Sequence, residues 1–186
     1  MKSFKNKVVV ITGAGSGIGR ALALVLSKRG AKLALNDFDR ESLDETKSML
    51  QGNVLTEAFD VSDKEKMYAF ATRIKTELGS AHAIINNAGI EGSTKPAFLT
   101  EPKEYERTMQ VNFNGVLYGT LAFLPQLVEN NEGAVINISS IFGLIGVPNN
   151  ADYCASKFAV RGFTETLMAE FEESPINIHC VHPGGI

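Results

Sequence analysis

Six short apolar runs that alternate with longer stretches of helical spacing are the feature that most constrains the fold of this chain. Short runs that are rich in β-branched residues and lack polar alternation are typical of strands buried on both faces. Such strands occur in parallel sheets whose connecting helices cover each side. The sequence therefore predicts an α/β fold built on a doubly wound parallel sheet. The six expected strands are Val8–Ile11, Leu33–Leu35, Val54–Phe59, Ala83–Ile85, Ala134–Ile138 and Ile176–Val181.

Three of the intervening segments carry clear helical signals. In the segment that follows Asp63, apolar residues recur at three- and four-residue steps, and the Asp63 carboxylate can accept backbone N–H groups at the helix start. A long helix is expected from about Glu104 to Asn130, kinked or shortened by Pro125, and another from about Asp152 to Glu173. The sequence contains no repeat or linker, so residues 1–186 are expected to form a single domain.

Charge balance and cysteine content exclude several classes of function. The chain has 18 Lys and Arg against 21 Asp and Glu, a net charge of −3, so no basic surplus is available to neutralise a nucleic-acid backbone. The two cysteines, Cys154 and Cys180, fit a reducing compartment better than a disulfide framework. No metal site is expected, because His179, Cys180 and His182 lack a further ligand at a workable spacing. No apolar run is long enough for a signal peptide or a bilayer span. We therefore expect a cytoplasmic protein that binds neither nucleic acid nor membrane.

A glycine-rich turn follows the first expected strand and leads into a helix. The segment Thr12-Gly13-Ala14-Gly15-Ser16-Gly17-Ile18-Gly19 lets the backbone adopt positive φ and approach a ligand closely. The helix N-terminus behind it presents free N–H groups to an anion such as a pyrophosphate. No Gly-Lys-Ser/Thr follows, so the turn is not a nucleoside-triphosphate P-loop. The alternative is a glycine-rich turn without a ligand, and the spacing departs from the general Gly-x-Gly-x-x-Gly pattern.

Asp37 ends the second expected strand. Its distance from the glycines is about that at which a carboxylate accepts hydrogen bonds from the adenosine ribose of NAD. A 2′-phosphate would meet like charge there, and Arg40 is the nearest cation that could offset it. Together with the glycine turn, this favours NAD over NADP as the cofactor. The alternative is that Asp37 only caps a turn within 36–39.

Tyr153 and Lys157 are four residues apart and therefore lie on one face of an expected helix. A free tyrosine titrates near pH 10, and a neighbouring cation favours the phenolate and lowers its pKa. Tyr153 can then exchange a proton with a substrate hydroxyl. Ser140 lies at the carboxyl end of an expected strand, on the sheet edge where open parallel sheets bind ligands. For the motif taken alone, a surface pair of tyrosine and lysine is the alternative.

Taken together, these motifs resemble those of the short-chain dehydrogenase/reductase family, whose members have a Rossmann fold. The matching elements occur in the family's order and extend from Lys7 to the last residue. They are Thr12-Gly13…Gly17-Ile18-Gly19, Asp60-Val61, Asn86-Asn87-Ala88-Gly89, Asn112, Ser140, Tyr153…Lys157 and Pro183-Gly184. The resemblance implies an NAD-dependent oxidoreductase that interconverts a secondary alcohol and a ketone. It also implies a homodimer or homotetramer assembled through the two long helices.

The resemblance implies a role for each matching residue. Tyr153 would be the general acid/base, and Ser140 would hydrogen-bond the reacting oxygen. Lys157 would lower the pKa of Tyr153 and hold the nicotinamide ribose, and Asn112 would anchor a water in the proton relay to Lys157. The cofactor-binding residues would be Gly13, Ser16, Gly17, Ile18, Gly19, Asp37, Asp60, Val61, Asn87, Gly89, Tyr153, Lys157, Pro183 and Gly184.

The end of the sequence departs from the family pattern. Family members continue past Pro-Gly with a substrate-covering loop, a helix and a further strand, whereas this sequence stops at Ile186. We therefore expect a C-terminally truncated form in which 176–181 is an edge strand with unpaired backbone groups. For this reason a catalytically silent dinucleotide-binding module, acting as a sensor or assembly partner, is the alternative function.

Overall fold

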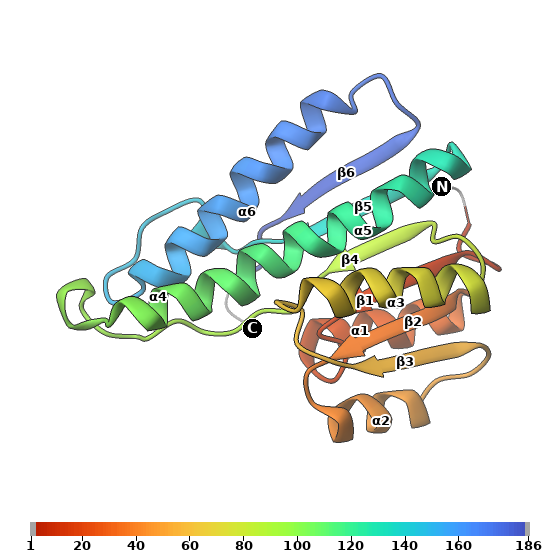
Figure 1. The fold of residues 1–186 in the computed structure, drawn as a ribbon, viewed down its shortest axis with the longest axis horizontal. Helices are drawn as coiled ribbons and strands as arrows, with labels where there is room; N and C mark the ends of the chain where they lie inside the picture. Colours follow the sequence, from red (N-terminus) through yellow and green to blue (C-terminus); the bar gives the residue numbers. More distant parts are fainter. Residues whose placement is uncertain (1–2, 185–186) are drawn as a thin grey trace.

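The computed structural model describes residues 3–184, and its sheet consists of six parallel strands in the order β3-β2-β1-β4-β5-β6 (Figure 1). The strands are β1 (Val8–Thr12), β2 (Lys32–Asp37), β3 (Val54–Ala58), β4 (Ala83–Asn86), β5 (Gly133–Ile138) and β6 (Ile176–Val181). Every expected strand is confirmed, with ends that differ by at most 2 residues. The strand order reverses between β1 and β4, and ligands bind beyond the carboxyl ends of the strands at such a reversal.

Side chains along each strand alternate between two apolar clusters, one on each face of the sheet. Val8 and Val10 pack on the face covered by α3 (Lys64–Glu77), α5 (Gly115–Asn130) and α6 (Ala151–Glu170). Val9 and Ile11 pack on the opposite face, with α1 (Gly17–Lys28) and α2 (Arg40–Ser48) (Figure 1). This two-sided burial is the physical reason why the strands read as continuous apolar runs in the sequence.

The helix expected over 104–130 contains a change of winding. α4 (Pro102–Met109) passes into a π turn at Gln110–Asn114 and then into α5, and the N–H of Gly115 bonds to the carbonyl of Gln110. Pro125 does not shorten the helix, because α5 continues to Asn130. The carbonyl that Pro125 deprives of a partner belongs to Leu121, which lies on the exposed side of α5, where water can satisfy it.

The other two expected helices are present. At the start of α3, Asp63 accepts a hydrogen bond from the N–H of Lys66 at 3.0 Å, as its position predicted. α6 begins at Ala151 and ends at Glu170, earlier than the predicted Glu173, because Phe171 leaves the helical conformation with φ −107° and ψ 13°.

β6 lies at one edge of the sheet, as expected, and pairs with β5. Beside it, the sheet face shared with α1 carries a groove of about 630 Å³ with mainly apolar walls. The walls come from α1 and from β1, β4, β5 and β6. Gly185 and Ile186, with which the sequence ends, lie outside the described residues.

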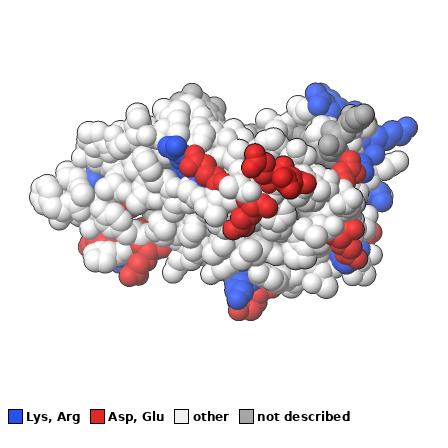
Figure 2. All heavy atoms as spheres, turned by 90° about the horizontal axis from the view of Figure 1, so that it is seen from above, with Lys and Arg blue, Asp and Glu red and all other residues white. Residues whose placement is uncertain are grey.

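Charged side chains are spread over the surface in separate groups. The face seen in Figure 2 has acidic groups near its middle and basic groups toward one end. Within residues 3–184, none of the helices combines the length and the apolar character that crossing a membrane requires.

Candidate active site

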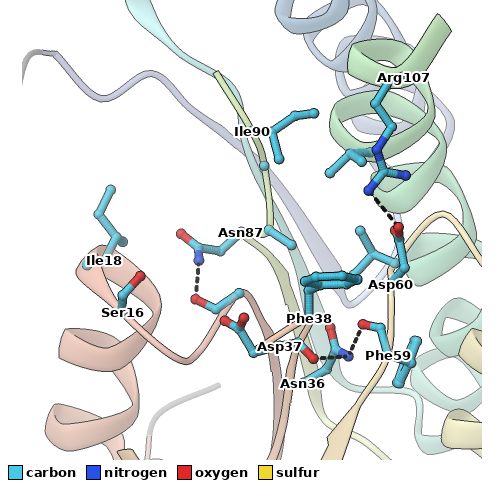
Figure 3. Close-up of a pocket in the computed structure, with 16 residues that line it drawn as sticks. Ser16, Ile18, Asn36, Asp37, Phe38, Phe59, Asp60, Asn87, Ile90 and Arg107 are labelled. Atoms are coloured by element: carbon cyan, nitrogen blue, oxygen red, sulfur yellow. Dashed lines mark hydrogen bonds and ion pairs between the residues drawn. The ribbon is translucent and has the colours of Figure 1, made fainter. Parts of the chain in front are cut away.

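A cavity of about 490 Å³ opens beyond the carboxyl ends of β1, β2 and β4, where the strand order reverses (Figure 3). The glycine turn forms one side of it, and segments that follow β2, β3 and β4 form the others. Its walls are Gly13, Ser16, Gly17, Ile18, Asn36, Asp37, Phe38, Phe59, Asp60, Val61, Asn87, Ala88, Gly89, Ile90, Arg107 and Val111. Most of the residues that the sequence assigned to the cofactor therefore line one space.

The glycines of the turn serve different purposes. Gly13 has φ +65°, and a Cβ there would lie 2.8 Å from the Cα of Ala88, so the turn and the end of β4 can only approach each other closely without a side chain. Gly17 has φ +49° and open space around it, which leaves the first turn of α1 accessible from the cavity. Gly19 does not line the cavity: a Cβ there would collide with the carbonyl oxygen of Gly13. Its role in this structure is to let α1 pack closely against the glycine turn and Asn87.

Asp37 lines the cavity and also organises the glycine turn. Its carboxylate accepts hydrogen bonds from the N–H of Gly15 at 2.7 Å and from the N–H of Asp39 at 3.0 Å. Asp37 thus does cap the turn, through the hydrogen bond from the N–H of Asp39. The same carboxylate also faces the cavity (Figure 3). Arg40 is not among the cavity walls.

Phe38 and Arg107 are cavity residues that sequence reasoning missed. Phe38 follows Asp37 directly and is 76% exposed, so an aromatic residue just after the acidic strand end was the available signal. Arg107 lies on α4 and pairs with Asp60 at 2.6 Å, an interaction across the chain that no local spacing indicates. Burial raises the pKa of Asp60, but hydrogen bonds from Ser62 and Arg107 outweigh it and hold that pKa below its ordinary value.

Two further cavities adjoin the first. The second, about 220 Å³, shares Ile18, Asn87, Gly89 and Ile90 with it and brings in a new set of side chains. That set is Ser140, Tyr153, Lys157, Pro183 and Gly184, together with Glu91, Ile138 and Ser139. The third, about 480 Å³, extends outward from Ser140 and Tyr153 along Ile141, Phe142 and Asn150. The glycine turn and three of the predicted catalytic residues, Ser140, Tyr153 and Lys157, therefore face one continuous depression.

Tyr153 lies near the start of α6, with its ring edge-on to Phe142 at a centroid distance of 5.9 Å. Burial raises the pKa of Tyr153, the hydrogen bond with Ser140 lowers it, and the negative charge of Glu91 raises it; the net pKa lies above the ordinary value. Burial therefore dominates the pKa of Tyr153, and the expected lowering of that pKa by Lys157 stays a prediction.

Lys157 is itself buried close to the ring of Tyr153. Its ammonium lies 5.6 Å from the centre of the Tyr153 ring and donates a hydrogen bond to the carbonyl of Ile138 at 3.1 Å. Burial lowers the pKa of Lys157 to about 8. The group is still mostly protonated at neutral pH, and its hydrogen bond holds it at the carboxyl end of β5.

Asn112 occupies the π turn and connects two segments of the site. Its amide donates hydrogen bonds to the carbonyl of Ile90 at 3.0 Å and to the hydroxyl of Ser156 at 3.1 Å, and its carbonyl oxygen accepts the N–H of Ile90 at 2.8 Å. Asn112 is fully buried and does not line the cavities. A Cβ on Gly89 would lie 3.2 Å from the Asn112 carbonyl oxygen and 3.4 Å from the Lys157 nitrogen, so both side chains approach the same glycine.

The ends of the strands fix the remaining site residues. Asn87 donates its amide hydrogens to the carbonyls of Thr12 and Gly13, both at 3.0 Å, and so ties β4 to the glycine turn. The carbonyl of Ser140 accepts a hydrogen bond from the ring of His182 at 3.0 Å, and the N–H of Ile141 bonds to Pro183 at 3.1 Å. The segment after β6 thereby holds Ser140 in place.

Comparison with known proteins identifies relatives of this chain. The family model described as short chain dehydrogenase matches residues 7–186. The Mycobacterium tuberculosis protein named "Putative oxidoreductase SadH" is 48% identical over 191 residues, which is 100% of this chain and 69% of that protein. Epidermal retinol dehydrogenase 2 of Homo sapiens is 43% identical over 174 residues, which is 91% of this chain and 56% of that protein.

Solved structures agree in fold. The crystal structure of a short chain dehydrogenase/reductase from Burkholderia phymatum in complex with NAD superposes with a TM-score of 0.96 and 32% identity. It is matched over 100% of this chain and 68% of that chain. The family model, the relatives and the shared fold together establish that this chain belongs to the short-chain dehydrogenase family of oxidoreductases.

Proposed function

We propose that this protein transfers a hydride between NAD(H) and a secondary alcohol or ketone, with Tyr153 as the general acid/base. One observation carries the proposal: Tyr153, Ser140 and Lys157 meet at one end of a depression whose other end holds the glycine turn and Asp37. A cofactor lying along that depression would present its reactive end to the phenol. The NAD complex of the Burkholderia phymatum relative supports this assignment.

The residues of the first cavity fit a dinucleotide. The accessible first turn of α1, at Gly17 and Ile18, suits a pyrophosphate. The Asp37 carboxylate has acceptor capacity for ribose hydroxyls beyond its two backbone hydrogen bonds. Among residues 3–184, the one cation in the cavity wall is Arg107, and it is engaged by Asp60. A 2′-phosphate would therefore face Asp37 without a free counter-charge, which favours NAD over NADP.

Each remaining residue of the predicted site has a proposed role. Asp60 and Val61 would contact the adenine, and Asn87 and Gly89 would line the adenosine side. Pro183 and Gly184 close the cavity that holds Tyr153. The water-anchoring role of Asn112, the cytoplasmic location and the homodimeric or homotetrameric state remain predictions.

Tyr153 performs the proton transfer in either direction. In reduction, its phenol gives a proton to the carbonyl oxygen as that oxygen becomes a hydroxyl; in oxidation, its phenolate takes the hydroxyl proton back. Ser140 orients the same oxygen by a hydrogen bond, and Lys157 contributes positive charge beside the phenol. NAD(H), when bound, supplies the hydride donor or acceptor. The raised pKa of Tyr153 keeps it protonated at neutral pH, the state that serves reduction.

Substitution of Tyr153 by phenylalanine tests the proposal. Tyr153→Phe should abolish turnover of a panel of secondary alcohols and ketones while the dissociation constant for NADH, measured by fluorescence titration, stays within about twofold. Retained turnover would overturn the role of Tyr153. If the unsubstituted protein binds NADH but turns over none of the panel, the catalytically silent module replaces the enzyme as its function.

A further inference from the structure

Asp152, the residue directly before Tyr153, is a buried carboxylate that the proposed chemistry does not use. It is 1% exposed. Its Oδ1 accepts the N–H of Tyr153 at 2.9 Å, and its Oδ2 accepts the N–H of Ser93 at 2.8 Å and the hydroxyl of Thr108 at 3.2 Å. One side chain therefore connects three segments: the start of α6, the loop after β4, and α4.

The environment favours a carboxylate at this position. Burying a charge is unfavourable unless hydrogen bonds replace its hydration, and Asp152 accepts three of them. Asp152 also lies in the first turn of α6, where the helix dipole favours negative charge. Two of its donors are backbone N–H groups on opposite sides. An asparagine has one acceptor oxygen, so its amide nitrogen would face one of these N–H groups, donor against donor.

Side chains hold both the backbone N–H and the backbone carbonyl of Tyr153. Asp152 holds the N–H, and the hydroxyl of Ser156 donates to the carbonyl at 2.7 Å. Ser156 in turn accepts a hydrogen bond from the buried Asn112. The start of α6, which carries the phenol, is thus attached through side chains to the π turn and to the loop after β4.

The loop after β4 rests directly on the carboxylate. A Cβ on Gly92 would collide with Oδ1 of Asp152, so the loop can sit this close only because Gly92 has no side chain. The same loop carries Glu91, which lines both cavities beside Tyr153 and raises the pKa of the phenol. Asp152 therefore sets the distance between the wall of the outer cavity and Tyr153.

We propose that Asp152 is a positioning residue, which orients Tyr153 and the Glu91-bearing loop for catalysis. The inference rests on the proposed oxidoreductase function. Small displacements of a reacting group lower the reaction rate strongly, and a shift of about 1 Å can lower turnover about a hundredfold. Loss of the Asp152 contacts should therefore reduce kcat while leaving the dinucleotide cavity intact, because none of the three hydrogen bonds is made to a wall residue of that cavity.

Asp152→Asn is the test variant, and Thr108→Val is the matched control, because it removes only the longest of the three hydrogen bonds. Asp152→Asn should lower kcat at least about tenfold, with the NADH dissociation constant within about twofold. Thr108→Val should leave both the kcat and the NADH dissociation constant nearly unchanged.

If Asp152 only joins α4 to α6, the two variants will behave alike, and that result overturns the proposal. If Asp152→Asn does not fold, Gly92→Ala, which displaces the carboxylate from the loop side, should show the same selective loss of kcat; unchanged kcat in that variant likewise overturns it.

A second readout is independent of turnover. In protein labelled with ¹³C at the tyrosine ring carbon that bears the oxygen, the Tyr153 resonance is identified as the one missing in Tyr153→Phe. Asp152→Asn should shift or broaden this resonance and leave those of Tyr68, Tyr105 and Tyr118 in place. An unchanged Tyr153 resonance in folded Asp152→Asn contradicts the positioning role. Absence of turnover in the unsubstituted protein contradicts the proposed function alone, since the resonance still reports on Asp152.

Discussion

Replacing Asn112 by alanine removes the side chain that fastens the loop after β4 to α6. Three hydrogen bonds are lost, two to the backbone of Ile90 and one to Ser156, at distances of 2.8–3.1 Å. A hydrogen bond contributes about 1 kcal/mol net to stability. Since Ile90 is partly exposed, water can reach its freed backbone groups, so no large desolvation term is added. Asn112→Ala should therefore lower the free energy of unfolding by about 3 kcal/mol.

Asn130→Ala is the matched control for this prediction. Asn130 lies at the end of the same helical segment and donates one hydrogen bond, to the carbonyl of Ala81 at 2.8 Å. Its replacement should therefore cost about 1 kcal/mol. Urea unfolding followed by circular dichroism gives both values, provided that the transition is two-state and its slope unchanged. The reasoning fails if Asn112→Ala costs no more than Asn130→Ala.

Two further predictions concern the cofactor and pH. Asp37→Asn removes a charge but keeps an acceptor, so it should weaken NADH binding about tenfold and reduce the ratio of NADH affinity to NADPH affinity. Asp39 is not among the cavity walls, so the control Asp39→Asn should change neither quantity. Equal effects of the two substitutions would contradict the cofactor role of Asp37. Because the pKa of Tyr153 is raised and the phenolate is the base, alcohol oxidation should increase with pH between about 6 and about 8 while ketone reduction does not. A flat pH profile for oxidation would show that Tyr153 is not the titrating base.

The fold could be predicted because its signals are local. β1 is buried along its whole length, so its sequence is a run of valine and isoleucine, and the other strands follow the same logic. Asp63 caps α3 by hydrogen bonding three residues ahead, a distance that spacing alone reveals. The π turn could not be predicted, because its residues are ordinary helix residues and the change of winding depends on what Asn112 contacts in space.

The site residues that could be predicted from the sequence are likewise those with local signals. Gly13, Asp37 and Tyr153 stand at strand ends or at helical spacing, and the structure places them around one depression. Asp152 and Arg107 were missed as site residues, since the partners that connect them to other segments lie 44 to 59 positions away in sequence. The direction of the Tyr153 pKa shift also depends on burial, which a two-residue motif does not encode.

The π turn at Gln110–Asn114 interrupts regular α-helical winding at the position of the buried Asn112. Its backbone accommodates one residue more than an α turn, so deleting a single residue there would restore an uninterrupted α-helix from Pro102 to Asn130. Because the π turn itself takes up the extra residue, the helical residues before and after the deletion would keep their faces. The change would fall on the turn, and so on Asn112, which bonds to Ile90 and Ser156. Regular helical winding and the placement of Asn112 therefore require different lengths of this one segment.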